Sequence, residues 1–233
     1  MIYVMSDIHG RMARFRDIMR QIRLRKEDHL YVLGDVIDRG RYGLPILMEL
    51  LRMDNVTVML GNHEHMMLEA LETNDSERMY IWYMNGGDVT HRRLLHCTKA
   101  YRQEVMTAIK KMPVNLDICC NGINYLLVHG GPLEASSQTD AVYESVWKRL
   151  EYYAILPEGK TVIFGHTPTR RYQPGRPLSI FHGKNRIGID CGCAYGSGMG
   201  GRLACLRLDD MKEFYSQAND GATQRKNRKR WDS

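Results

Sequence analysis

Three short apolar or β-branched segments occur in the first third of the chain, at residues 2–5, 30–33 and 56–60. Each is followed by a polar cluster and then by apolar residues spaced three or four apart, as at Phe15, Ile18, Met19 and Ile22. That spacing places the apolar side chains on one face of a helix. A repeated order of strand, loop and helix predicts neighbouring parallel strands joined by right-handed crossovers.

The pattern then changes twice. Residues 75–112 are helical in pattern throughout and end at Pro113, which predicts a helical insert. Beyond it, residues 114–120 and 123–128 flank Asn121-Gly122, a dipeptide that favours a tight hairpin turn. Further candidate strands are residues 161–164, 179–181, 186–189, 203–208 and 213–215. An αβ first half and a β-rich second half predict two packed sheets with helices outside.

Composition and charge narrow the classes of protein. A chain of 233 residues, 43% apolar and 26% charged, fits a single domain with a sizeable core. The net charge is +6, and residues 225–230 alone contribute five positive charges, so the rest of the chain is near neutral. We expect one folded domain over residues 1–216 and a basic, mostly disordered tail over residues 217–233. The tail could bind an acidic partner, but we expect no stable nucleic-acid complex.

The apolar stretches and the cysteines indicate the compartment. No apolar stretch approaches the roughly 18 residues that a membrane-spanning helix needs. Six cysteines without a CxxC pair are typical of reduced thiols rather than of a disulfide framework or a thiolate zinc site. We therefore predict a cytoplasmic protein without a membrane span.

Polar clusters end five of the predicted strands. They are Asp7-Ile8-His9-Gly10, Gly34-Asp35-Val36-Ile37-Asp38-Arg39-Gly40, Gly61-Asn62-His63-Glu64, His129-Gly130 and Gly165-His166-Thr167. The carboxyl ends of strands meet at one edge of an open α/β sheet, so these side chains are expected to converge. Mixed oxygen and nitrogen donors suit manganese, iron or zinc rather than calcium. The donors exceed the needs of one tetrahedral ion, whereas two ions sharing a carboxylate would satisfy them. Asn62 also precedes a helical pattern and is expected to cap that helix.

These clusters, in this order, resemble the metallophosphoesterase signature of the phosphoprotein phosphatase (PPP) family, within the calcineurin-like superfamily. The similarity runs from Ser6 to about Leu208. Residues 82–87, 146–149 and 189–192 resemble the bacterial and bacteriophage lambda phosphatase branch in particular. The resemblance implies an α/β (α+β) fold, an αββα sandwich of two packed mixed β-sheets flanked by helices, with the insert around residues 75–112.

The resemblance also implies roles for individual residues. One metal would be held by Asp7, His9 and Asp35, the other by Asn62, His129 and His166, with Asp35 bridging. Arg39 and Arg149 would bind the substrate phosphate, His63 would be the general acid, and Asp38 would orient His63. The two divalent ions would be manganese, with iron or zinc as alternatives. A metal-bridging hydroxide would attack phosphoserine or phosphothreonine in proteins, without a covalent intermediate.

Two other functions stay open. A symmetrical dinucleoside tetraphosphatase, or another nucleotide hydrolase, would use a closely similar fold. The Asp38-Arg39-Gly40 form resembles the protein-phosphatase branch, because the tetraphosphatases often lack that aspartate. A non-catalytic module that binds phosphorylated ligands is the second alternative. The presence of all six ligands, His63 and both arginines argues against it.

Overall fold

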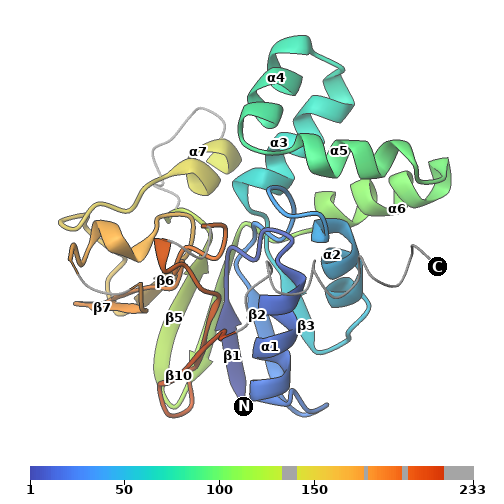
Figure 1. Ribbon diagram of the computed structural model, residues 1–233. Helices are drawn as coiled ribbons and strands as arrows, with labels where there is room; N and C mark the ends of the chain where they lie inside the picture. Colours follow the sequence, from blue (N-terminus) through green and yellow to red (C-terminus); the bar gives the residue numbers. More distant parts are fainter. Residues whose placement is uncertain (133–140, 176–177, 196–198, 218–233) are drawn as a thin grey trace.

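The computed structural model describes residues 1–132, 141–175, 178–195 and 199–217 of the chain. It contains two five-stranded sheets that lie face to face, with helices on the outer faces (Figure 1). This is the predicted two-sheet sandwich.

The first sheet has the strand order β10-β9-β1-β2-β3. Its strands are β1 (Ile2–Met5), β2 (His29–Val32), β3 (Val56–Val58), β9 (Ala204–Arg207) and β10 (Lys212–Tyr215). β1, β2 and β3 are parallel, as the repeated strand, loop and helix order predicted, and β9 joins β1 antiparallel. The parallel strands therefore end at the same edge of the sheet.

The second sheet has the order β4-β5-β6-β8-β7. Its strands are β4 (Asn115–Cys120), β5 (Ile123–Val128), β6 (Thr161–Phe164), β7 (Phe181–Gly183) and β8 (Arg186–Gly188). Asn121 and Gly122 both have positive φ angles, 50° and 77°, as the predicted tight hairpin turn between β4 and β5 requires. β5 and β6 are parallel, so they also end at a common edge.

The alternation of side chains along each strand divides the core. Val4 of β1 packs between the sheets with Leu127 of β5. Met5, the next residue of β1, points the other way and packs with Phe15 of α1 (Met12–Ile22). On the far side of the second sheet, Val128 packs with residues of a third cluster. α1, α2 (Gly43–Leu51) and α3 (Asn62–Thr73) cover the outer face of the first sheet.

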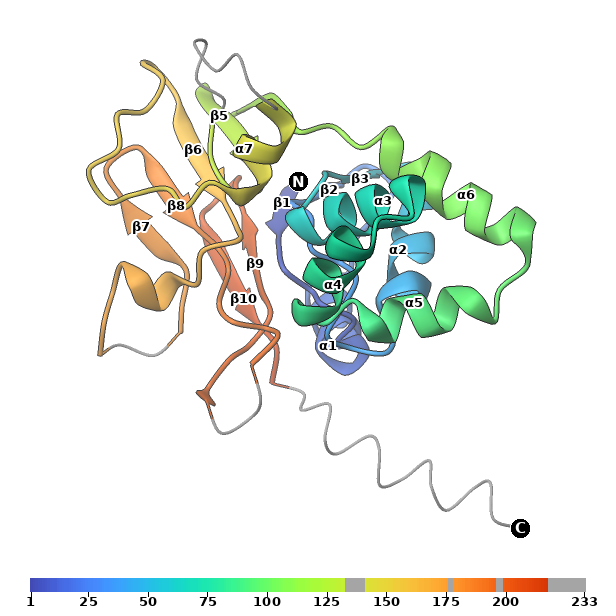
Figure 2. The same cartoon turned by 90° about the horizontal axis from the view of Figure 1, so that it is seen from above.

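The predicted helical insert forms three helices. They are α4 (Ser76–Met84), α5 (Asp88–Leu95) and α6 (Lys99–Lys110). Asp75 and Thr98 accept backbone hydrogen bonds at the starts of α4 and α6. Figure 2 shows α4, α5 and α6 on the side of the first sheet and α7 (Ala141–Trp147) on the side of the second.

Several predicted boundaries need correction. Predicted strand 179–181 lies two residues later, at β7, because Phe181 pairs with Gly188 and Gly183 pairs with Arg186. Predicted strand 56–60 ends at Val58 in β3. The helix α7 and the short 3-10 helix η1 (Thr169–Arg171) were not predicted.

The predicted basic tail, apart from Gln217, lies outside the described residues. Its binding to an acidic partner stays a prediction. Within the described ranges, each helix is too short or too polar to cross a lipid bilayer.

Candidate active site

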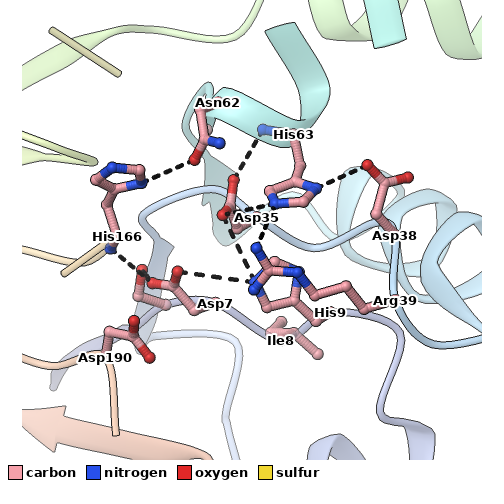
Figure 3. Close-up of polar contacts among 12 residues, drawn as sticks. Asp7, Ile8, His9, Asp35, Asp38, Arg39, Asn62, His63, His166 and Asp190 are labelled. Carbon is pink, nitrogen blue, oxygen red and sulfur yellow. Dashed lines mark hydrogen bonds and ion pairs between the residues drawn. The ribbon is translucent and has the colours of Figure 1, made fainter. Parts of the chain in front are cut away.

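The five polar clusters converge at one edge of the two sheets, as expected from the strand order. Figure 3 shows residues of these clusters other than His129-Gly130. β1 leads to Asp7 and His9, β2 leads to Asp35, Asp38 and Arg39, and α3 begins with Asn62 and His63. The second sheet contributes His129 after β5 and His166 after β6. All of these side chains are buried except Arg39.

The backbone at these strand ends adopts an unusual conformation. Six of the converging residues have left-handed backbone angles, with φ of 54° at Asp7, 48° at His9, 54° at Asp35, 65° at Asp38, 61° at Arg39 and 56° at His166. Residues with a Cβ atom adopt this region at a cost in free energy. The loops are held together by backbone hydrogen bonds, including His9 N to Asp35 O at 2.9 Å and Gly10 N to Val36 O at 2.8 Å.

The side chain of Glu64 holds the loop that follows β2. Its fully buried carboxylate accepts hydrogen bonds from four backbone N–H groups, those of Asp35 (2.8 Å), Val36 (2.9 Å), Ile37 (3.1 Å) and Gly61 (3.2 Å). The sequence analysis gave Glu64 no role. An acidic residue three positions after the N-cap residue, here Gly61, is a recognisable capping signal, and in this structure it also reaches a distant loop.

The first predicted ligand group surrounds His9. Its Nε2 lies 3.6 Å from Asp35 Oδ2 and 4.0 Å from Asp7 Oδ1. The other ring nitrogen, Nδ1, donates to the Ile37 carbonyl oxygen at 3.1 Å, since a carbonyl can only accept. His9 therefore presents the lone pair of Nε2 to the two carboxylates. Asp7 Oδ2 accepts from the backbone N–H of His166 at 3.0 Å, which ties this group to the second sheet.

The second predicted group is centred on Asn62. Its Oδ1 lies 2.9 Å from His129 Nε2 and 2.9 Å from His166 Nδ1, and His129 Nε2 is also 3.3 Å from Asp35 Oδ1. His129 Nδ1 donates to the Leu33 carbonyl, so Nε2 carries a lone pair. Lone pairs of nitrogen and oxygen thus face one another, an arrangement that a cation stabilises. Asn62 is the first residue of α3, with Gly61 before it, so the prediction that Asn62 caps the helix was wrong.

The electrostatics of the cluster favour cations in the same way. Burial raises the pKa values of Asp7 and Asp35 well above their ordinary value, and repulsion from Asp190 and from Asp7, respectively, adds to the rise. Burial lowers the pKa values of His9 and His129 well below theirs, and that of His166 to about 4. A neutral imidazole can bind a divalent metal directly, whereas a carboxyl group with a raised pKa must first lose its proton, and a nearby cation favours that loss. His166 Nε2 is buried and has no hydrogen-bond partner among the described residues.

His63 and Asp38 form a buried pair beside the ligands. His63 Nδ1 lies 2.7 Å from Asp38 Oδ2, and neither side chain is exposed to solvent. Burial, and then the charge of Arg39, lower the pKa of His63 well below its usual value. Burial raises the pKa of Asp38 to about 7. Arg39 donates from its two terminal nitrogens to the Nε2 atoms of His9 and His63, each at 2.9 Å.

A cavity of about 350 Å³ opens onto these residues. Arg149, which follows α7 and is exposed, lines this cavity, and its role in phosphate binding stays a prediction. The sequence analysis assigned no role to several further lining residues, which are Asn85, Trp147, Pro168, Asp190, Gly192, Ala194 and Tyr195. Asp190 follows β8 within two residues, so the rule of polar clusters at strand ends could have found it. Burial raises its pKa to about 6.

The metal prediction fits this donor set. Among the described residues, two groups of histidine and carboxylate side chains have ligand atoms close enough to share an ion, His9 with Asp35 and His63, and Asp35 with His129 and His166. The first of these groups contains His63, which was predicted as the general acid, and lacks the predicted ligand Asp7. Asp35 belongs to both groups, as expected of a bridging ligand.

Comparison with known proteins adds to the geometry. The family model of the calcineurin-like phosphoesterases matches residues 1–190. Serine/threonine-protein phosphatase 1 of Salmonella typhimurium is 29% identical over 178 residues, which are 73% of this chain and 80% of that protein. The symmetrical bis(5'-nucleosyl)-tetraphosphatase of Acidovorax ebreus is 26% identical over 175 residues, covering 72% of this chain and 57% of that protein.

Solved structures share the fold. The crystal structure of a metallophosphoesterase from Sphaerobacter thermophilus has a TM-score of 0.61 at 14% identity, covering 98% of this chain and 93% of that one.

Proposed function

Because the chain belongs to the calcineurin-like phosphoesterase family, it is a phosphatase-type hydrolase, and we propose that it removes phosphate from phosphoserine and phosphothreonine in proteins. The observation that carries the proposal is the placement of the buried His63–Asp38 pair beside two ligand groups that share Asp35. The similarity to a bacterial serine/threonine-protein phosphatase over 80% of its length supports the choice of substrate.

We assign six side chains to two divalent cations. Asp7, His9 and Asp35 would hold one, and the other would be held by Asn62, His129 and His166 together with Asp35. Mixed carboxylate, amide and imidazole donors suit manganese, with iron or zinc as alternatives. When bound, the cations supply positive charge that lowers the pKa of a water molecule and stabilises charge on the phosphoryl group.

Arg39 and Arg149 are proposed to bind the phosphoryl oxygens, because a guanidinium group offers paired donors that match them. Arg39 donates to His9 and His63 in the structure. A phosphate dianion is a stronger acceptor than a neutral imidazole, so binding of substrate would draw Arg39 away from both rings. The lone pair of His9 Nε2 would then be available to the cation that His9 is assigned to hold.

The same movement prepares His63 to act as an acid. The charge of Arg39 lowers the pKa of His63. The negative charge of an approaching phosphate dianion would raise it. With Nδ1 held by Asp38, the proton to be donated would sit on Nε2, which faces the cluster. His63 would transfer this proton to the serine or threonine oxygen as it leaves phosphorus.

The alternative substrate is a dinucleoside tetraphosphate. The Acidovorax ebreus relative, which matches 72% of this chain, favours this reading. Asp38 supports the protein-phosphatase proposal, because it is present, buried and paired with His63.

A side-by-side assay tests the proposal. The protein with manganese would be given phosphoserine, phosphothreonine and phosphotyrosine peptides, a dinucleoside tetraphosphate, a cyclic nucleotide and nitrophenyl phosphate. We expect the highest kcat/KM on the phosphoserine and phosphothreonine peptides. Preference for the tetraphosphate would replace the proposal by the alternative, and metal-dependent binding without turnover would identify a non-catalytic module.

The leaving group isolates the role of His63. A nitrophenolate leaves without a proton, whereas a serine alkoxide needs one, so His63→Asn should reduce turnover of a phosphoserine peptide about 10²-fold or more beyond its effect on nitrophenyl phosphate. Metal content should be unchanged. Equal losses on both substrates would mean that His63 does not act as the general acid.

A further inference from the structure

The carboxylate that orients His63 is also held by the insert. Trp82 of α4 donates from its indole Nε1 to Asp38 Oδ2 at 2.8 Å, and this is the oxygen that contacts His63 Nδ1 at 2.7 Å. The Trp82 side chain is fully buried and lies 44 residues from Asp38 in the sequence. One carboxylate oxygen thus joins a residue of the helical insert to the imidazole at the site.

The insert also contacts the backbone of the same loop. Asp38 N donates to the Thr90 hydroxyl oxygen of α5 at 3.1 Å, and Arg39 N donates to the Gly86 carbonyl at 3.0 Å. Asp38 and Arg39 are consecutive residues with left-handed φ angles of 65° and 61°. Two such residues in succession are costly, so the loop keeps this shape only where its surroundings hold it.

The turn between α4 and α5 is shaped to make these contacts. A Cβ atom on Gly87 would lie 2.1 Å from Trp82 Nε1, so only glycine allows the turn to pack against the indole. Gly86 has a φ of +92°, and a Cβ atom there would lie 2.9 Å from the Arg39 side chain. The turn therefore packs against the tryptophan on one side and the arginine on the other.

We propose that Trp82, Thr90 and the turn at Gly86 and Gly87, here called the insert clamp, position the reacting groups by holding Asp38 against His63 and Arg39 in its left-handed conformation. This rests on the proposed function of His63 as proton donor. The insert would thereby contribute to proton transfer without touching the substrate.

The Asp38 carboxylate would lose its fixed orientation without Trp82. Asp38 Oδ2 receives two donors from different elements, and removal of the indole N–H leaves the carboxylate free to turn about its side-chain bonds. Its other oxygen, Oδ1, is buried, and the geometry gives it no hydrogen-bond partner among the described residues. If the carboxylate turns, it loses its hydrogen bond to His63 Nδ1. The imidazole ring can then rotate, and Nε2 no longer points in a fixed direction.

The test compares Trp82→Phe with a matched change in packing. Trp82→Phe keeps an aromatic ring but lacks the N–H group, and we expect about a tenfold lower kcat on a phosphoserine peptide with less than about a twofold change on nitrophenyl phosphate. Leu94→Ala removes a buried apolar side chain of α5 that makes no hydrogen bond to Asp38 or Arg39. It should lower the melting temperature without this substrate bias.

A double-mutant cycle distinguishes positioning from general damage. If Trp82 acts through Asp38, Trp82→Phe should have little further effect on the phosphoserine peptide when Asp38 is already alanine. If the double variant instead lost activity by the product of the two single-variant factors, the proposal would be overturned. Thr90→Val, which loses the hydroxyl, should also lower kcat on the peptide, and Thr90→Ser should restore it to within about twofold. Equal effects of valine and serine would contradict a role for the hydroxyl.

A proton NMR measurement does not depend on catalysis. The hydrogen-bonded Nδ1–H of His63 should give a downfield resonance that is lost in Asp38→Ala, broadened or shifted in Trp82→Phe, and kept in Leu94→Ala. An unchanged resonance in Trp82→Phe would refute the clamp. If the wild-type protein hydrolysed no phosphate ester, the proposed function would fail, while this resonance would still decide whether Trp82 positions the pair.

Discussion

Asp35→Asn tests the metal assignment through stability as well as activity. Asp35 lies between the two ligand groups, with Oδ1 3.3 Å from His129 Nε2 and Oδ2 3.6 Å from His9 Nε2. Oδ1 also accepts the backbone N–H of His63 at 3.0 Å, a bond that asparagine can keep. The amide group of asparagine can donate toward the imidazole lone pairs. The substitution therefore removes the charge and leaves the local geometry in place.

The expected gain in the stability of the metal-free protein has an upper limit. Burial raises the pKa of Asp35 well above its ordinary value of 3.8, so the folded state binds a proton that the unfolded state has released. This costs about 1.4 kcal/mol for each pH unit above the unfolded pKa, or at most about 4 kcal/mol at pH 7. The cost is absent below the unfolded pKa and grows as pH rises toward the folded one. Asparagine avoids this cost, and we expect a gain of about 1 to 3 kcal/mol, or roughly 2 to 12 °C in melting temperature.

The assay is thermal unfolding in chelator and in manganese, together with metal analysis of the purified protein. Asp35→Asn should melt higher than the wild type in chelator, gain little from manganese, and lose both metals and activity. Asp190→Asn is the matched control, because it neutralises another buried carboxylate in the same cavity that is not an assigned ligand. It should keep both metals. Retention of two tightly bound ions by Asp35→Asn, or equal metal loss in both variants, would refute the bridging assignment.

Three further results are expected. Arg149→Ala should raise KM and lower kcat for phosphate monoesters while metal content stays constant, whereas Arg41→Ala, an exposed control, should leave steady-state kinetics unchanged. The manganese-induced rise in melting temperature should increase from pH 5 to pH 8, because the raised pKa values of Asp7 and Asp35 mean that protons must leave before a cation binds; a flat profile would contradict this. Glu64→Gln should lower the free energy of unfolding by about 2 to 4 kcal/mol in denaturant titrations, because its amide group would face backbone N–H donors; an unchanged midpoint would refute this role.

Local sequence patterns correctly predicted those strands whose own residues and flanking turns are enough to identify them. Residues 2–5 and 123–128 are apolar runs with clear turn signals, and they form β1 and β5 with the expected bounds. Polar clusters at strand ends converge because parallel strands share an edge, and this requires no knowledge of side-chain contacts. The helix α7 was missed because its seven residues include only two buried ones, Ser145 and Val146, which form no periodic stripe.

Contacts between distant segments could not be predicted in this way. Trp82 appeared as one apolar residue of a helical stripe with Met79 and Tyr83, and Tyr83 is exposed. Only the folded arrangement shows that its indole reaches Asp38. The predicted helical insert over residues 75–112 likewise gave no reason for Gly86 and Gly87, which pack against Arg39 and Trp82 between α4 and α5.

The left-handed backbone at the strand ends turns the polar side chains of the site toward one another. Asp7 and His9 are two residues apart, and each has a positive φ, so the chain turns sharply after β1 and both side chains face the cluster. Such residues cost roughly 1 to 2 kcal/mol each relative to ordinary backbone. The cost is offset by backbone hydrogen bonds between the loops and by the buried carboxylate of Glu64, whose partners are all N–H groups. Because these bonds involve none of the side chains proposed to bind a cation, we expect the protein fold to set the geometry of the proposed ligands before any cation binds.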